Sequence, residues 1–274
     1  MDVARYLALA ALGTAVGAYG TLIGAGGGFI LMPVLLLLYP HQDPAQLASI
    51  SLAVVFLNAL SGSAAYGRMG RIDYRSGLLF AAAAVPGAVL GAIHTSLLPR
   101  RIFDVLLGAL LVAGAAFLAL RPRTAGASRS VGPRRFRLAR RIIDAHGTTH
   151  EYSVNLPLGL AASAVVGYLS SLLGIGGGIV HVPLLVYALG FPVHVATATS
   201  HFVLAVMALS GTLVHVATGA FTQGVHRTIV LGIGVVLGAQ VGARLSERMR
   251  GRWIIRGLAM ALAVVGLRIL AAAS

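Results

Sequence analysis

The sequence contains no cysteine, and only 7 of its 274 residues are acidic. The lack of cysteine excludes a disulfide, a thiolate metal site and a cysteine nucleophile. Charge of either sign is scarce: 10% of residues are charged against 58% hydrophobic, and no residue from Tyr152 through His226 is Asp, Glu, Lys or Arg. One spanning helix needs only ~20 such residues, whereas a water-soluble domain would need charges on its outer faces. The composition therefore indicates an integral membrane protein.

The basic residues are all arginine, and they give the chain a net charge of +14. In a soluble protein this excess would suggest nucleic-acid binding. Here the arginines gather in short connections and in one linker, which indicates anchoring at the cytoplasmic membrane surface and no nucleic-acid partner. The segments lack the alternating period of a membrane barrel, so we expect helical spans. The apolar run at the N-terminus is too long for a cleaved signal peptide.

One motif occurs twice. Residues 24–35 read GAGGGFILMPVL, and residues 174–185 read GIGGGIVHVPLL. The agreement continues beyond the glycines, because residues 45–52 match 193–200, and LSGS at 60–63 matches LSGT at 209–212. We therefore expect a duplicated unit, with a first transmembrane repeat at 1–120, a basic cytoplasmic linker at 121–155 and a second transmembrane repeat at 156–274.

Each half contains three clear spans after its glycine break, predicted at 45–67, 75–96 and 102–120 and at 194–217, 227–246 and 253–272. A single helix over residues 6–39 would reach about 50 Å, against a hydrocarbon core of ~30 Å. The break should therefore separate one helix from a short half-helix at 29–39.

These elements predict an all-α polytopic membrane protein with two repeats of five helical elements each. Because five is an odd number, the second repeat would be inverted relative to the first. With the N-terminus outside, most arginines then fall on the inside, as the positive-inside rule requires. The alternative is eight spans with parallel repeats and both termini inside, which fits that rule less well.

The linker is expected to contain a β-hairpin. Residues 146–149 read HGTT and lie between two β-prone stretches, so the turn would use Gly147 at positive φ. His146 and His150 have no carboxylate or cysteine set at metal-binding spacing, so we expect no metal site.

The two glycine turns are the strongest candidates for a binding site. Each precedes a short helix whose first N–H groups have no intrahelical partner and whose start is partially positive. Such a start can hold an anion without a basic side chain, and glycine lets the ligand approach the backbone. In inverted halves, both starts could face one site at mid-membrane. Close helix packing is the alternative role. The residues are Gly26, Gly27, Gly28, Gly176, Gly177 and Gly178.

A polar cluster follows one loop later in each half. Its hydroxyl and amide groups could complete the coordination of an oxyanion, although serine and threonine often bond their own helix backbone. Asn58 and His201 are the costliest to bury in a membrane and so the stronger candidates. The cluster consists of Ser49, Ser51 and Asn58 in the first half and Thr197, Thr199, Ser200 and His201 in the second.

His201 and His215 are candidates for proton coupling, because histidine titrates near neutrality; a neutral imidazole bonded to a carbonyl is the alternative. No acidic residue lies in the middle of a predicted span. The spans thus lack the carboxylates that a proton relay or a cation site would need, which favours an anionic substrate. An inside-negative potential drives an anion outward by ~2.3 kcal/mol per charge per 100 mV, so we expect export.

The doubled motif is similar to that of a known family. The paired glycine elements, each followed by Ala-x-x-[Ser/Thr] and Ser-Gly and then by Gly70-Arg71-Ile72 or Gly219-Ala220-Phe221, resemble the TauE/SafE sulfite-exporter family of membrane permeases. The resemblance covers nearly the whole chain. It implies an anion permease, with members associated with sulfite and other small sulfur-containing organic anions. The family is functionally broad, so the resemblance does not identify the substrate.

We therefore predict a multi-pass permease of the inner (plasma) membrane that exports sulfite or organosulfonates by alternating access. An anion channel is the alternative that the same helix starts would permit. An intramembrane hydrolase would need a serine nucleophile with a histidine base, but Ser200 and His201 are adjacent and point in different directions on a helix. We expect no cofactor; the expected partners are the anion and the lipid bilayer, and a homo-oligomer is compatible with the sequence.

Overall fold

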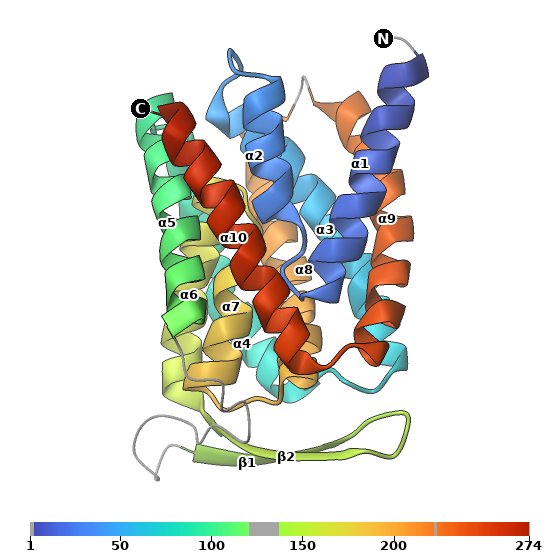
Figure 1. Cartoon of the computed structure of the whole chain (residues 1–274). Coiled ribbons are helices and arrows are strands. Elements are labelled where there is room, and N and C mark those ends of the chain that lie inside the picture. Colours follow the sequence, from blue (N-terminus) through green and yellow to red (C-terminus); the bar gives the residue numbers. More distant parts are fainter. Residues whose placement is uncertain (1–2, 121–136, 222–223, 274) are drawn as a thin grey trace.

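The computed structural model of the chain describes residues 3–120, 137–221 and 224–273, and it shows a bundle of helices with one β-hairpin at its end (Figure 1). The N-terminal part of the predicted linker lies outside the described residues. The first half consists of α1 (Val3–Leu22), α2 (Gly28–Leu38), α3 (Pro44–Arg68), α4 (Tyr74–Thr95) and α5 (Arg100–Leu120). The second consists of α6 (Leu156–Leu173), α7 (Gly178–Pro183) with the π-helical turn η2 (Leu184–Ala188), α8 (Val193–Ala217), α9 (Val225–Arg248) and α10 (Gly251–Ala273).

The prediction of an all-α polytopic membrane protein is confirmed. Within the described residues, 7 helices are long and apolar enough to cross a membrane, namely α3, α4, α5, α6, α8, α9 and α10. Shorter apolar helices cover Tyr6–Leu22, Gly28–Leu38 and Gly178–Ala188. The six spans predicted after the breaks coincide with helices to within about two residues at each end, which is the ordinary uncertainty of helix boundaries.

The glycine motifs interrupt the chain at corresponding places. In the first half Gly24, Gly26 and Gly27 have positive φ, and in the second Gly174, Gly176 and Gly177 do. This region of backbone space is strained for residues with a Cβ, so the chain ends one helix there and starts a short one. The α1–α2 pair lies toward the end that holds both termini, whereas α7 lies toward the β-hairpin (Figure 1).

Both termini lie at the end of the bundle opposite to the β-hairpin (Figure 1). This placement agrees with an odd number of elements in each half. The inverted relation of the repeats and the orientation of the bundle across a membrane stay predictions.

The two halves interlock through several extended helix contacts. α3 packs on α8 at the centre, while α1 packs along α9 and α4 along α6. Glycines allow these close approaches: a Cβ on Gly87 of α4 would meet the backbone of Ala164 in α6, and a Cβ on Gly238 of α9 would meet that of Thr14 in α1. The same small-residue contact thus joins each half to the other.

The β-hairpin consists of β1 (Arg137–Ile143) and β2 (Thr149–Asn155), paired antiparallel. Gly147 lies in the turn with φ 79°, in the segment where the sequence predicts it. Asn155 ends β2 and caps α6, because its side chain accepts a hydrogen bond from the Leu158 N–H at 3.3 Å. The hairpin is therefore tied directly to the start of the second half.

Candidate functional site

The two glycine turns meet in the buried interior of the bundle. Every residue from Gly20 through Phe29 and from Ser170 through Ile179 is buried. A Cβ on Gly28 would lie 2.5 Å from the carbonyl oxygen of Ile175, and a Cβ on Gly178 would lie 2.6 Å from that of Gly24. The starts of α2 and α7, contributed by opposite halves, are thus side by side.

The space beside the turns is filled in this conformation. Cβ positions on Gly26 and Gly176 would both meet the side chains of Val55 in α3 and Leu204 in α8. Gly27 packs in the same way against Val16. Close packing, the alternative weighed from the sequence, therefore explains why glycine is needed here. The first N–H groups of each short helix remain without an i−4 helical partner.

Asn58 holds the first turn in place. Its Nδ2 donates to the Gly26 carbonyl at 3.0 Å, and its Oδ1 accepts from the Thr21 hydroxyl at 3.1 Å. The Thr21 hydroxyl also lies 3.2 Å from Nε2 of His201, and all three side chains are fully buried. Nδ1 of His201 is buried without a hydrogen-bond partner. The structure thus brings Asn58 and His201 together, through Thr21, beside the first glycine turn.

Two predicted serines hold glycine-turn carbonyls across the interface of the halves. Ser51 on α3 donates to the carbonyl of Gly174, and Ser200 on α8 donates to that of Gly24 at 3.4 Å. Each serine therefore donates a hydrogen bond to the turn of the opposite half. Ser200 and His201 bond different partners, so they do not form a nucleophile–base pair.

The other predicted hydroxyls bond groups outside the glycine turns. Ser49 donates to the Gln46 carbonyl at 2.7 Å, and Thr197 donates to the Val193 carbonyl at 2.8 Å, as side chains bonded to their own helix do. Thr199 accepts the Asp73 N–H at 3.0 Å and so supports the start of α4. In this conformation these three residues stabilise helices and loops.

The polar cluster is not repeated at the second turn. A Cβ on Gly62 would meet His201 at 2.6 Å and Thr21 at 3.0 Å, whereas one on Gly211 would meet the Ser171 hydroxyl at 2.9 Å and Leu52 at 3.0 Å. Leu52 thus lies against Gly211 in the way that His201 lies against Gly62, so an apolar side chain replaces the imidazole at the second turn. The Ser171 hydroxyl is buried without a partner.

Sequence reasoning missed Thr21, Ser170 and Ser171, the polar residues that immediately precede the two breaks. Their positions in otherwise apolar helices were the available signal. The hydroxyl of Ser170, like that of Ser171, is buried without a partner. Tyr66 was missed as well: its hydroxyl donates to the Thr21 carbonyl at 2.6 Å, and its ring lies edge-on to His201 at 5.8 Å.

His215 lies far from this cluster. It follows His201 on α8 at a separation of about 20 Å, given the rise of 1.5 Å per residue. Its Nε2 is buried without a partner. A direct proton transfer between the two histidines is therefore not possible in this conformation.

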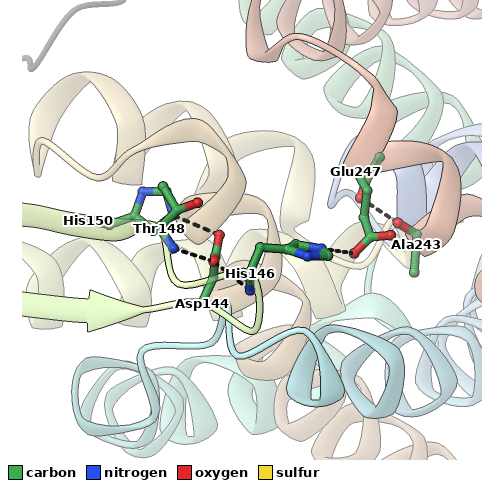
Figure 2. Close-up of polar contacts among 7 residues, drawn as sticks. Asp144, His146, Thr148, His150, Ala243 and Glu247 are labelled. Atoms are coloured by element: carbon green, nitrogen blue, oxygen red, sulfur yellow. Dashed lines mark hydrogen bonds and ion pairs between the residues drawn. The ribbon is translucent and has the colours of Figure 1, made fainter.

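The carboxylates at the helix ends have structural partners. Asp43 caps α3 by accepting from the Ala45 N–H at 2.7 Å, and Asp104 pairs with Arg100 at 2.9 Å. Figure 2 shows the turn of the hairpin, where His146 reaches Glu247 of α9 at 3.4 Å. Among the described residues, no three His, Asp or Glu side chains form a group that could hold a metal ion.

Asp144 organises this turn (Figure 2). Its Oδ1 accepts from the N–H groups of His146 and Thr148 at 3.0 and 2.9 Å, and its Oδ2 lies 3.4 Å from His150. Burial by itself would raise the pKa of Asp144, but these hydrogen bonds outweigh it and hold the pKa below its usual value. The ionised carboxylate therefore stabilises the hairpin turn.

Tyr152 and Arg140 connect the hairpin to α4. The Tyr152 hydroxyl donates to Oδ2 of Asp73 at 2.9 Å, and Nε of Arg140 lies 3.5 Å from the same oxygen. Burial first, and then the charge of Asp73, raise the pKa of Tyr152, so its hydroxyl stays protonated. Asp73 also caps α4 through the Ser76 N–H at 3.1 Å, so its carboxylate is fully engaged.

Comparison with known proteins agrees with these features. The family described as "Sulfite exporter TauE/SafE" matches residues 9–269. The chain is 29% identical to "Probable membrane transporter protein YunE" of Bacillus subtilis (strain 168), with 97% of each chain covered. It is 23% identical to "Probable membrane transporter protein MJ0441" of Methanocaldococcus jannaschii, with 93% of this chain and 92% of the relative covered. No solved structure gives a significant match.

Proposed function

Because this chain belongs to the TauE/SafE sulfite-exporter family, and is a membrane transporter as its relatives are named, we propose that it exports small sulfur oxyanions. The substrates would be sulfite or organosulfonates, moved across the inner (plasma) membrane by alternating access. The proposal concerns the substrate, the direction and the mechanism.

The observation that carries the proposal is the meeting of two helix starts in the buried interior. The backbones of Gly28 and Gly178 each approach the opposite turn so closely that no Cβ fits between them. Two helix N-termini together supply partial positive charge and N–H donors at their first turns, which suit an oxyanion without any lysine or arginine. Thr21, Asn58 and His201 lie beside the first start and supply further donors.

Val55 and Leu204 would act as the gate. They cover Gly26 and Gly176 in this conformation, so an anion can reach the turns only after these side chains move. Ser51 and Ser200 hold the carbonyl of the opposite turn, and a change in these two hydrogen bonds would accompany any movement of one half against the other. The conformation described here would then be an occluded one.

The end with the β-hairpin would face the cytoplasm. Arg68, Arg71 and Arg75 lie in or beside the α3–α4 loop at this end, and Arg244 and Arg248 lie in the last turns of α9. This placement follows the positive-inside rule. An inside-negative potential then favours outward movement of an anion by ~2.3 kcal/mol per charge per 100 mV, so export would need no coupled ion.

Flux in proteoliposomes tests the proposal. We expect saturable sulfite efflux that accelerates with an imposed potential in the driving direction. His201→Leu, which copies Leu52 at the second turn, should lower the flux by about tenfold or more, the effect of losing ~1.4 kcal/mol. Thr212→Val is the matched control, because this hydroxyl bonds only the Ala208 carbonyl of its own helix at 2.7 Å. Flux that does not saturate would indicate a channel, and no flux of sulfite or organosulfonates would refute the proposal.

A further inference from the structure

Arg71 is a buried cation that lacks partners for two of its nitrogens. It lies in the loop between α3 and α4, at the hairpin end of the bundle, and only 7% of its surface is exposed. Both Nε and Nη1 are buried, and neither has a hydrogen-bond partner among the residues that the structure describes. Leaving a charged group buried and unpaired is costly, so an anion that paired with this guanidinium would remove that cost.

The neighbouring carboxylates do not neutralise Arg71. Asp73 is engaged by Arg140, Tyr152 and the N-terminus of α4. Asp144, whose turn packs on the loop that carries Arg71, is occupied by the turn itself and by His150. In the described part of the chain no ion pair includes Arg71. The missing counter-charge must therefore come from outside the described chain.

A short chain of contacts leads from Arg71 to the glycine turns. Its backbone N–H donates to the Tyr66 carbonyl at 3.3 Å. Tyr66 donates to the Thr21 carbonyl at 2.6 Å, and the Thr21 side chain belongs to the cluster with Asn58 and His201. Tyr66 and Thr21 thus connect the loop that carries Arg71 to the first glycine turn.

We propose that Arg71 forms an oxyanion-binding station on the cytoplasmic side, which receives the substrate before it reaches the glycine turns. Nε and Nη1 of the guanidinium each carry N–H donors that can hydrogen-bond oxygens of a sulfite or sulfonate group. The attraction of the unpaired charge would also raise the local concentration of anions at the mouth of the pathway. This inference rests on the proposed function and deepens it.

Binding of sulfite to the purified protein in lipid-free detergent tests the station. Titration calorimetry and the rise in unfolding temperature would be measured for the wild type, Arg71→Gln, Arg71→Lys and Arg75→Gln. Arg75 is the matched control, because it is an exposed arginine on the first turn of α4 and its replacement removes the same charge. We expect Arg71→Gln to weaken sulfite binding by about tenfold or more, Arg71→Lys to restore it in part, and Arg75→Gln to leave it unchanged.

Stability without sulfite separates a binding role from a structural one. If Arg71 is a binding residue, Arg71→Gln in anion-free buffer should unfold at the wild-type temperature or above it, because an unpaired buried charge has been removed. Unfolding at a clearly lower temperature would show a structural residue and overturn the inference. Sulfite binding by Arg71→Gln with wild-type affinity would also overturn it.

Two further arms identify the source of the oxyanion and separate the two proposals. Stabilisation of the wild type by phosphatidylglycerol but not by sulfite, lost in Arg71→Gln, would assign the site to a lipid headgroup and refute a substrate station. Absence of sulfite flux in wild-type proteoliposomes would refute the proposed function. Normal wild-type flux, with an unchanged KM for sulfite on the hairpin side in Arg71→Gln, would refute only the station at Arg71.

Discussion

Replacing Asn58 by leucine should loosen the first glycine turn. The side chain donates to the Gly26 carbonyl at 3.0 Å and accepts from the Thr21 hydroxyl at 3.1 Å, and all of it is buried. Leucine has a similar volume, so the main loss is two hydrogen bonds. A buried partner left unsatisfied costs about 1–3 kcal/mol, whereas side-chain hydrogen bonds inside membrane proteins average about 0.6 kcal/mol. We therefore expect a loss of about 1–4 kcal/mol in the free energy of unfolding.

The assay is thermal unfolding of the purified protein in detergent. In a protein of this size each kcal/mol changes the Tm by about 2–4 °C, so Asn58→Leu should lower the Tm by roughly 2–16 °C. Met207→Leu is the control, because Met207 is fully buried and lies against Gly177 of the second turn, where its terminal methyl is 3.1 Å from a Cβ position. A near-isosteric apolar change there should cost less than about 1.5 kcal/mol.

Two results would refute this reasoning. One is an Asn58→Leu protein that unfolds at the same temperature as Met207→Leu. The other is a double-mutant cycle between Asn58→Leu and Thr21→Val with no coupling energy, since the two side chains share a hydrogen bond and should not behave independently.

Three further predictions concern the glycine turns, the hairpin and the topology. Gly28→Ala should abolish folded protein, because its Cβ would lie 2.5 Å from the Ile175 carbonyl oxygen. Gly114→Ala is the control and should be tolerated, because its Cβ would meet only the tip of a leucine side chain at 3.3 Å. Equal yields of the two proteins after size-exclusion chromatography would contradict this prediction. The lowered pKa of Asp144 means that its ionised form stabilises the hairpin above the usual carboxyl pKa and that this contribution is lost as pH falls through the lowered value. Hydrogen exchange in the hairpin should therefore accelerate in acid, and Asp144→Asn should remove that pH dependence while Glu151→Gln, at an exposed site, keeps it. Tags on both termini should react with an impermeant reagent from outside while a tag in the linker should not; termini on opposite sides, or both inside, would exclude the inverted arrangement.

The spans and their breaks could be predicted because the responsible signals are local. Long uncharged runs identify the helices, and an apolar run too long for one crossing, interrupted by Gly26-Gly27-Gly28, must change direction. The hairpin could be predicted for the same reason, since Gly147 marks a turn between two β-prone stretches. Each of these features depends on neighbours in the sequence.

The contents of the candidate site could be predicted only in part. Asn58 and His201 stand out because an amide and an imidazole are costly to bury in a membrane, and the structure places both beside the first turn. Thr21 links Asn58 to His201, and Tyr66 donates to the Thr21 carbonyl. A threonine hydroxyl in an apolar helix most often bonds its own backbone, and a tyrosine hydroxyl gives no sequence signal of its partner. Only the packing of α1 against α3 and α8 shows that these two hydroxyls do more.

The sequence by itself determined that the chain is a duplicated, membrane-embedded helical protein whose halves each break at a triple glycine, because composition and periodicity suffice for that. The tertiary structure decided which groups meet. Ser51 donates to the Gly174 carbonyl and Ser200 donates to the Gly24 carbonyl, so each half supplies a hydrogen bond to the turn of the other. It also left the Arg71 guanidinium buried with no carboxylate partner in the described part of the chain. Such pairings depend on how helices distant in the sequence pack together, and no local pattern carries that information.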